Sequence, residues 1–262
     1  MGYFHFAHSY VRGNWRKESE TGPSILAKCC HDLDMIYYLT GKKALKVYSV
    51  GSRKAFLPEN APAGAPSHCL SGCPESATCP YHVNKIYLRP TLHSFPYMIM
   101  HKRIICEKPG TSMKEFREIL KTSRFGRCVY KCDNDVIENQ VVSLKLENDI
   151  NATLTMTAHT NKCFRHTRIC GTKGEIIGEG GKFKVNVFAG KKKKYSFGIL
   201  ESIGHMSGDA GITRDFLKLM QTGELTSRVS LMSETIESHM NAFAAEESRK
   251  TGKEIDTAEF RK

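Results

Sequence analysis

The middle of this sequence is built from short stretches in which apolar and polar side chains alternate between turn residues. Two stretches, residues 141–147 and 152–159, are joined by the polar turn 148–151. Four more follow at close spacing, at 166–171, 174–178, 183–188 and 194–197. Connections this short join antiparallel neighbours, because a parallel crossover needs about a dozen residues or more. The chain is therefore constrained to fold around an antiparallel meander.

Three other segments have the apolar periodicity of amphipathic helices. Residues 24–39 place apolar side chains at helical spacing, and Gly41 is a typical helix end. Near the C-terminus, residues 209–222 and 233–250 follow the same period, and Gly252 ends the second of them. The sequence therefore predicts one helix before the meander and two after it.

Shorter patterns complete the expected architecture. Residues 2–11 predict an aromatic-rich strand, and residues 45–50 predict a short one. Residues 57–127 accumulate Pro, Gly, Cys and Ser and lose periodicity, apart from a helical pattern over 112–120, which predicts a long irregular insertion. We therefore expect one α+β domain over residues 1–262, with a large, mostly antiparallel open sheet and helices on one face.

The chain has 262 residues and a net charge of +12. The positive charges are scattered, except for the block 191–194, which lies between two strand-like stretches and predicts a solvated hairpin tip. No zinc-finger, RNP or helix-turn-helix signature accompanies the charge, so it does not favour a nucleic-acid partner. The sequence contains neither a long apolar run nor a signal peptide, so we expect no membrane segment and a cytoplasmic location.

Three of the ten cysteines are clustered within the expected insertion, at Cys69, Cys73 and Cys79. In a chain with intracellular character, such clusters indicate free thiols or a metal site rather than disulfides. A structural zinc ion needs a fourth ligand, which we expect to be Cys132, with Cys128 or His82 as alternatives. The competing interpretation is a set of ordinary reduced thiols.

The N-terminal stretch FAHSYVRGNWR, residues 6–16, gathers polar side chains that are able to line a pocket. We expect His8, Arg12, Asn14 and Arg16 to bind substrate hydroxyls or phosphates. A second stretch, SILAKCCHDLD, residues 24–34, sets His31 beside carboxylates in the first helix.

Together with PENAPAGAP (58–66), GRCVYKCDND (126–135), ICGTKGE (169–175), GHMSGD (204–209) and AAEESR (244–249), these stretches resemble the substrate-side domain of the Gfo/Idh/MocA oxidoreductase family. The resemblance covers nearly the whole chain. It implies NAD(P)-dependent oxidation or reduction of sugars and polyols, and a homo-oligomer formed through the sheet. The N-terminal Rossmann domain of the family has no counterpart in the sequence, which lacks a Gly-x-Gly-x-x-Gly turn.

The resemblance also implies roles for particular residues. His31 matches the family histidine that moves the hydroxyl proton during hydride transfer. Many members carry an aspartate four residues earlier, where this chain has Ala27, so the neighbouring Lys28 is a candidate polar partner or an exposed lysine. His205 and Asp209 match a stretch near the substrate pocket, although Asp209 is equally suited to cap the following helix.

The tripeptide Glu107-Lys108-Pro109 resembles the family's catalytic lysine motif, which makes Lys108 a candidate cofactor contact. In the family this motif follows a strand of the Rossmann domain, whereas here it falls in the insertion. A chance likeness, on a surface segment before a helix, is the favoured interpretation.

Three functional hypotheses follow. The first is the catalytic and substrate domain of such an oxidoreductase, either truncated or paired with a dinucleotide-binding domain carried by a separate protein, and inactive without that domain. The second is a non-enzymatic domain that binds a small polyol or a partner protein through its sheet. The third is a basic, zinc-stapled nucleic-acid binder.

Overall fold

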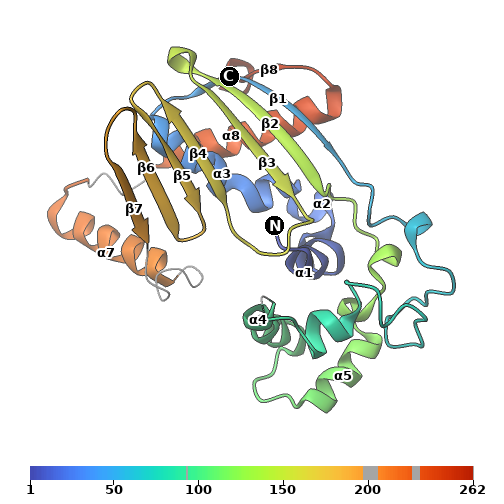
Figure 1. Ribbon diagram of the computed structural model, residues 1–262. Helices are drawn as coiled ribbons and strands as arrows, with labels where there is room; N and C mark the ends of the chain where they lie inside the picture. Colours follow the sequence, from blue (N-terminus) through green and yellow to red (C-terminus); the bar gives the residue numbers. More distant parts are fainter. Residues whose placement is uncertain (93, 197–205, 226–230, 262) are drawn as a thin grey trace. The chain divides into compact units, whose positions relative to one another are not determined.

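A computed structural model (Figure 1) describes residues 1–92, 94–196, 206–225 and 231–261. The chain divides into two compact units, one formed by residues 1–162 and 233–262 and the other by residues 163–232. The α+β class with open antiparallel sheets is confirmed, and the described strands form two sheets of four strands each. No helix in the described part of the chain is long and apolar enough to cross a membrane.

The sheet of the first unit has the strand order β3-β2-β1-β8. Its strands are β1 (Ala44–Ser52), β2 (Asn139–Leu146), β3 (Asn151–Thr157) and the short β8 (Ile255–Asp256). All of its neighbouring strands are antiparallel, and β2 pairs with both β1 and β3 along nearly its whole length. The alternating pattern of β2 therefore presents Val142, Leu144 and Leu146 to one face of the sheet.

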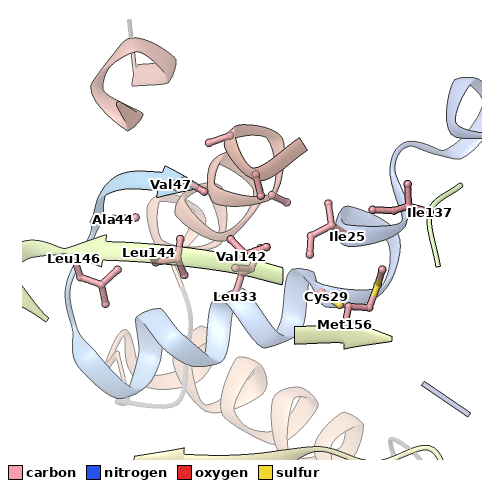
Figure 2. Packing of buried hydrophobic residues seen from close by; sticks show 13 residues of the cluster. Ile25, Cys29, Leu33, Ala44, Val47, Ile137, Val142, Leu144, Leu146 and Met156 are labelled. Atoms are coloured by element: carbon pink, nitrogen blue, oxygen red, sulfur yellow. The ribbon is translucent and has the colours of Figure 1, made fainter. Parts of the chain in front are cut away.

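Two long helices, α3 (Ser24–Thr40) and α8 (Met232–Thr251), lie on one side of strands β1 to β3 (Figure 1). Helical spacing brings Ile25, Cys29 and Leu33 of α3 to one stripe, which packs on the apolar face of the sheet. Figure 2 shows these side chains facing those of β1 and β2. The core consists of Ile25, Cys29, Leu33, Ala44, Val47, Ile137, Val142, Leu144, Leu146, Met156, Ala242, Ala244 and Ala245.

The N-terminal segment is helical, so the strand predicted for residues 2–11 is wrong. Helix α1 (Tyr3–Phe6) continues into a π-helical turn, Ala7–Arg12, and α2 (Glu18–Thr21) follows. Every side chain of the π-helical turn is buried, and among the described residues the segment pairs with extended chain only through a single bridge between Gly2 and Thr160. Its buried backbone groups are therefore satisfied by local, helical hydrogen bonds.

The insertion contains more helix than the sequence predicts. The expected helix over 112–120 is confirmed as α5 (Met113–Thr122), whose N-cap Ser112 accepts a hydrogen bond from the Glu115 amide. The preceding helix α4 (Phe95–Cys106) was not predicted, because its exposed apolar side chains blur the helical period. Shorter helical turns are Asn14–Arg16, Pro58–Asn60, Asn84–Leu88, Arg124–Gly126, Val129–Lys131, Glu147–Asp149 and Thr257–Arg261.

The second unit holds the remaining meander. Its strands are β4 (His166–Gly171), β5 (Gly174–Glu179), β6 (Lys182–Val187) and β7 (Lys192–Ser196), paired in sequence order, and helix α7 spans Met206–Thr222. The lysine block predicted as a hairpin tip mostly belongs to β7, and the turn lies at Ala189 and Gly190. Lysines along an exposed edge strand oppose pairing with another chain.

Candidate functional site

His31 lies on the solvent-facing side of α3. The buried stripe of the helix runs through Cys29 and Leu33, and His31 projects about 200° around the axis from Cys29. Lys28 is half-buried and precedes His31 by three residues, so the two side chains share one helix face. An exposed imidazole next to an ammonium group is able to exchange a proton with a bound hydroxyl.

His5, His8 and His101 form a stack of imidazoles between α1, the π-helical turn and α4. The ring centroids of His8 and His101 are 3.6 Å apart, and those of His5 and His101 are 6.2 Å apart. Phe125 stacks on His8 at 4.9 Å, and His8 Nδ1 is 3.0 Å from the Tyr87 hydroxyl. His8 is only 3% exposed, which places this predicted substrate contact inside the protein.

Burial lowers the pKa of all three stacked rings. It lowers the pKa of His8 to about 2 and, without any other cause, that of His101 to about 4. The pKa of His5 falls to about 3, first through burial and then through the positive charge of Lys28. Neither nitrogen of His101 has a hydrogen-bond partner among the described residues, so the buried stack is neutral and some of its polar atoms are unsatisfied.

Arg12 is 1% exposed, and its donors are directed at the insertion. Its Nε donates to the Arg127 carbonyl at 2.8 Å, and Nη2 donates to the Tyr81 carbonyl at 2.8 Å and contacts Cys69 Sγ at 3.7 Å. These bonds tie three distant parts of the chain together. The geometry therefore suits a structural guanidinium better than the substrate contact predicted for Arg12.

The other polar candidates of this stretch lie near the surface. Asn14 is exposed and accepts a hydrogen bond from Arg124. Arg16 is bound to Asp133 at 3.2 Å and to Glu20 at 3.4 Å. Both side chains therefore have protein partners, which a ligand would have to displace.

The remaining candidates lie in other segments of the chain than α3. Lys108 is exposed in the turn between α4 and α5, so the Glu-Lys-Pro motif follows a helix and not a strand. Asp209 lies in the first turn of α7 in the second unit; because α7 begins at Met206, the prediction that Asp209 caps the helix is wrong. His205 lies outside the described residues.

The predicted zinc ligands are only partly brought together. Cys69, Cys73 and Cys79 line one narrow pocket, and the fourth thiol there belongs to Cys128. The thiol of the expected ligand Cys132 instead contacts the Cys128 carbonyl at 3.3 Å. The alternative ligand His82 donates a hydrogen bond from Nε2 to the Cys69 carbonyl at 3.0 Å. Among the described side chains, no group of three or more potential ligands is arranged to hold a metal ion, so zinc is not supported.

One arrangement was missed by the sequence analysis. Glu138, just before β2, is 1% exposed, and its carboxylate lies 3.2 Å from Nε2 of His159, just after β3. The other ring nitrogen of His159 faces the Tyr81 hydroxyl at 3.5 Å. The available signal was a carboxylate directly after the apolar pair Val136-Ile137, where a strand pattern predicts an apolar residue.

The described residues do not fit a dinucleotide. Both sheets are antiparallel, and neither contains a strand, Gly-rich turn and helix in the order that cradles a pyrophosphate. We therefore assign no described residue of this chain to NAD(P).

Several solved structures share the fold. The oxidoreductase domain protein from Kribbella flavida matches with a TM-score of 0.57 and 10% identity, over 93% of this chain and 54% of that one. The aldose–aldose oxidoreductase from Caulobacter crescentus, complexed with glycerol, matches with a TM-score of 0.51 and 12% identity, over 94% of this chain and 51% of that one. An oxidoreductase from Agrobacterium radiobacter, in complex with NAD+, L-tartaric acid and magnesium, matches with a TM-score of 0.50 and 12% identity, over 98% of this chain and 61% of that one.

These likenesses are to parts of longer proteins, since the chain spans 51 to 61% of the three structures. No curated protein sequence matches the chain. The family model for the C-terminal alpha/beta domain of the Gfo/Idh/MocA oxidoreductases matches residues 2–250. The chain therefore belongs to this oxidoreductase family and corresponds to its C-terminal domain.

Proposed function

We propose that this chain supplies the substrate-binding and proton-transfer part of an NAD(P)-dependent oxidoreductase that acts on the hydroxyl groups of a sugar or polyol. The observation that carries the proposal is the exposed His31 on the first long helix of a domain that matches the family over residues 2–250. Some structural neighbours carry names that point the same way, among them a myo-inositol dehydrogenase and an aldose–aldose oxidoreductase.

In this proposal His31 is the proton acceptor when a substrate hydroxyl is oxidised, and the proton donor in the reverse reaction. Lys28 lies on the same helix face, where its positive charge stabilises a hydroxyl oxygen that is losing its proton. NAD(P) would supply the hydride acceptor. It would be held by a dinucleotide-binding domain outside the described residues, so we expect this chain alone to be inactive.

We further propose that the outer face of the first sheet joins copies of the chain. Tyr48 and Val50 of β1 are 41% and 51% exposed, and Val141, which pairs with Val50, is 41% exposed. A contiguous apolar patch on a sheet face is typical of a protein interface. The same patch would serve a different protein partner if the domain were not enzymatic.

We also propose that the protein works in the cytoplasm. None of the ten cysteines forms a disulfide, not even buried ones such as Cys106 and Cys128. Free thiols persist in a reducing compartment.

Histidine ring NMR of the full chain tests the central proposal. Titration with D-glucose or myo-inositol should shift the ring signals of His31, and the His31→Asn variant should bind more weakly. The exposed His239 of α8 serves as the control, and its signals should stay in place. An unchanged His31 in the presence of every sugar and polyol tested would overturn the proposal.

Isothermal calorimetry with NADH and NADPH tests the cofactor part separately. We expect no binding to the chain alone, because the described residues contain no pyrophosphate-binding turn. Micromolar binding would mean that this chain carries its own dinucleotide site, with Lys108 as the first residue to substitute.

A further inference from the structure

Segments from five parts of the first unit surround an open depression at one end of its sheet. Its walls include Lys54 after β1, Tyr81 of the insertion, Tyr130, Asn139 at the start of β2 and His159 after β3. Its volume of about 490 Å³ lies within the range of small-molecule sites. No residue of α3 lines the depression, so it is a different place from the surface that presents His31.

A buried carboxylate organises this depression. The oxygens of Glu138 accept hydrogen bonds from the amides of Ala55 at 3.0 Å and Phe56 at 2.9 Å, which fixes the chain that leaves β1. One of them also accepts the Nε2 proton of His159 at 3.2 Å. Because a carboxylate only accepts, this bond places the ring proton on Nε2 whenever the imidazole is neutral. The Nδ1 atom of His159 is then an acceptor.

The hydrogen bond that His159 Nδ1 accepts within the protein is weak. The hydroxyl of Tyr81 is 3.5 Å from His159 Nδ1, which is longer than a strong hydrogen bond involving a hydroxyl. The His159 side chain is 33% exposed, in contrast to the 1% exposure of Glu138. A hydroxyl group entering the depression is therefore able to replace the Tyr81 hydroxyl as the donor to His159 Nδ1 and to hydrogen-bond with the Tyr81 oxygen.

Aromatic rings line the same depression. The rings of Tyr81 and Tyr130 are 6.5 Å apart and nearly perpendicular, at 86°. Phe56 supports them from behind, with its ring 5.0 Å from that of Tyr81 and stacked on His159 at 5.8 Å. Aromatic faces combined with a few fixed polar groups suit a ligand that has both C–H surfaces and hydroxyl groups.

We propose that this depression is a second ligand site, which binds a neutral hydroxyl-rich molecule, a saccharide or polyol. One hydroxyl of the ligand donates to His159 Nδ1 while its C–H face rests against Tyr81 and Tyr130. The buried negative charge of Glu138 disfavours an anionic ligand, since only Lys54 among the residues lining the depression carries a permanent positive charge. The site goes beyond the proposed function, because it shares no residue with the surface around His31.

The test is a titration of the full chain with D-glucose and with myo-inositol, followed by the ring signals of His159 and by saturation transfer from protein to ligand. We expect a saturable shift of His159. His159→Phe keeps the ring stacked on Phe56 but removes the acceptor, and it should weaken binding about tenfold. His31→Asn is the matched control and should leave the His159 site unaffected.

A second variant guards against misfolding. Tyr130→Ala removes an aromatic wall without touching Glu138, and Trp15 fluorescence shows whether each variant is folded. Binding that shifts His31 alone rejects this site and supports the proposed function, whereas binding that shifts His159 alone does the opposite. No shift of His159 with either probe, or equal affinity in the wild type and both folded variants, overturns the inference.

Discussion

The stack of His5, His8 and His101 makes the first unit sensitive to acid. In the unfolded chain a histidine has a pKa near 6.5, whereas burial lowers the folded pKa values to about 3, 2 and 4. Below about pH 6.5 the unfolded chain therefore binds more protons than the folded one, so the free energy of unfolding decreases as the pH is lowered. The stability that the neutral rings contribute is fully present above about pH 6.5 and is lost progressively as the pH falls towards the folded pKa values.

The magnitude follows from the linkage. Each pH unit below about 6.5 costs roughly 1.4 kcal/mol per histidine that stays neutral in the folded state. Lowering the pH from 7 to 5 should therefore remove about 2 kcal/mol for each stacked ring. The loss from all three is comparable with the whole free energy of unfolding of an ordinary domain, about 5–15 kcal/mol.

His101→Phe isolates one ring of the stack. Phenylalanine keeps the contact with His8 but removes two buried nitrogens that have no hydrogen-bond partner. At pH 7 the variant should gain about 1–3 kcal/mol in unfolding free energy. Between pH 7 and 5 it should lose about 2 kcal/mol less than the wild type does.

Urea unfolding at several pH values measures both effects. The only tryptophan of the chain, Trp15, lies 6.1 Å from Tyr10 in the same unit, so its fluorescence reports on this part of the structure. His239→Gln removes an exposed histidine and should leave the pH dependence unchanged. If His101→Phe keeps the full wild-type loss between pH 7 and 5, the interpretation of the stack as buried and neutral is refuted.

Three further changes test the fold, each by urea unfolding. Leu33→Ala opens a cavity under β2 and should cost about 2–5 kcal/mol; a loss below 1 kcal/mol would contradict the packing of α3. Ser112→Ala removes the cap of α5 and should cost about 1 kcal/mol, and Ser112→Asp, which restores an acceptor, should recover most of it. Gly126→Ala would set a Cβ 1.7 Å from the Leu120 carbonyl oxygen, so it should destabilise the insertion. Gly72→Ala is the control: its Cβ has open space, so the variant should lose only the stability that an alanine loses at a positive φ.

Family membership and most regular elements followed from the sequence alone. The strands over 141–147 and 152–159, the helix over 24–39 and the helix before Gly252 are all present, because local periodicity and end signals decide them. The sequence also indicates His31 as a candidate residue on the exposed face of a helix, because the apolar periodicity of residues 24–39 shows which face of that helix is buried.

The tertiary structure decided where the polar side chains go. Residues 2–11 have the pattern of a strand, yet the absence of a strand neighbour leaves local hydrogen bonds as the way to bury their backbone. Arg12 and His8 resemble ligand contacts in the sequence but are buried against the insertion. Their partners, such as Tyr81 and His101, lie some 70 to 90 residues away, at separations that no local pattern encodes.

The same reason explains how two clusters of polar side chains are assembled. Glu138 meets His159 because β2 and β3 pair in a fixed register, and Cys128 joins Cys69, Cys73 and Cys79 because the insertion folds back on itself. Spacing along the chain determines which face of a helix or strand a residue occupies. Which faces then meet is decided by long-range packing, and the chemistry of a site depends on that second step.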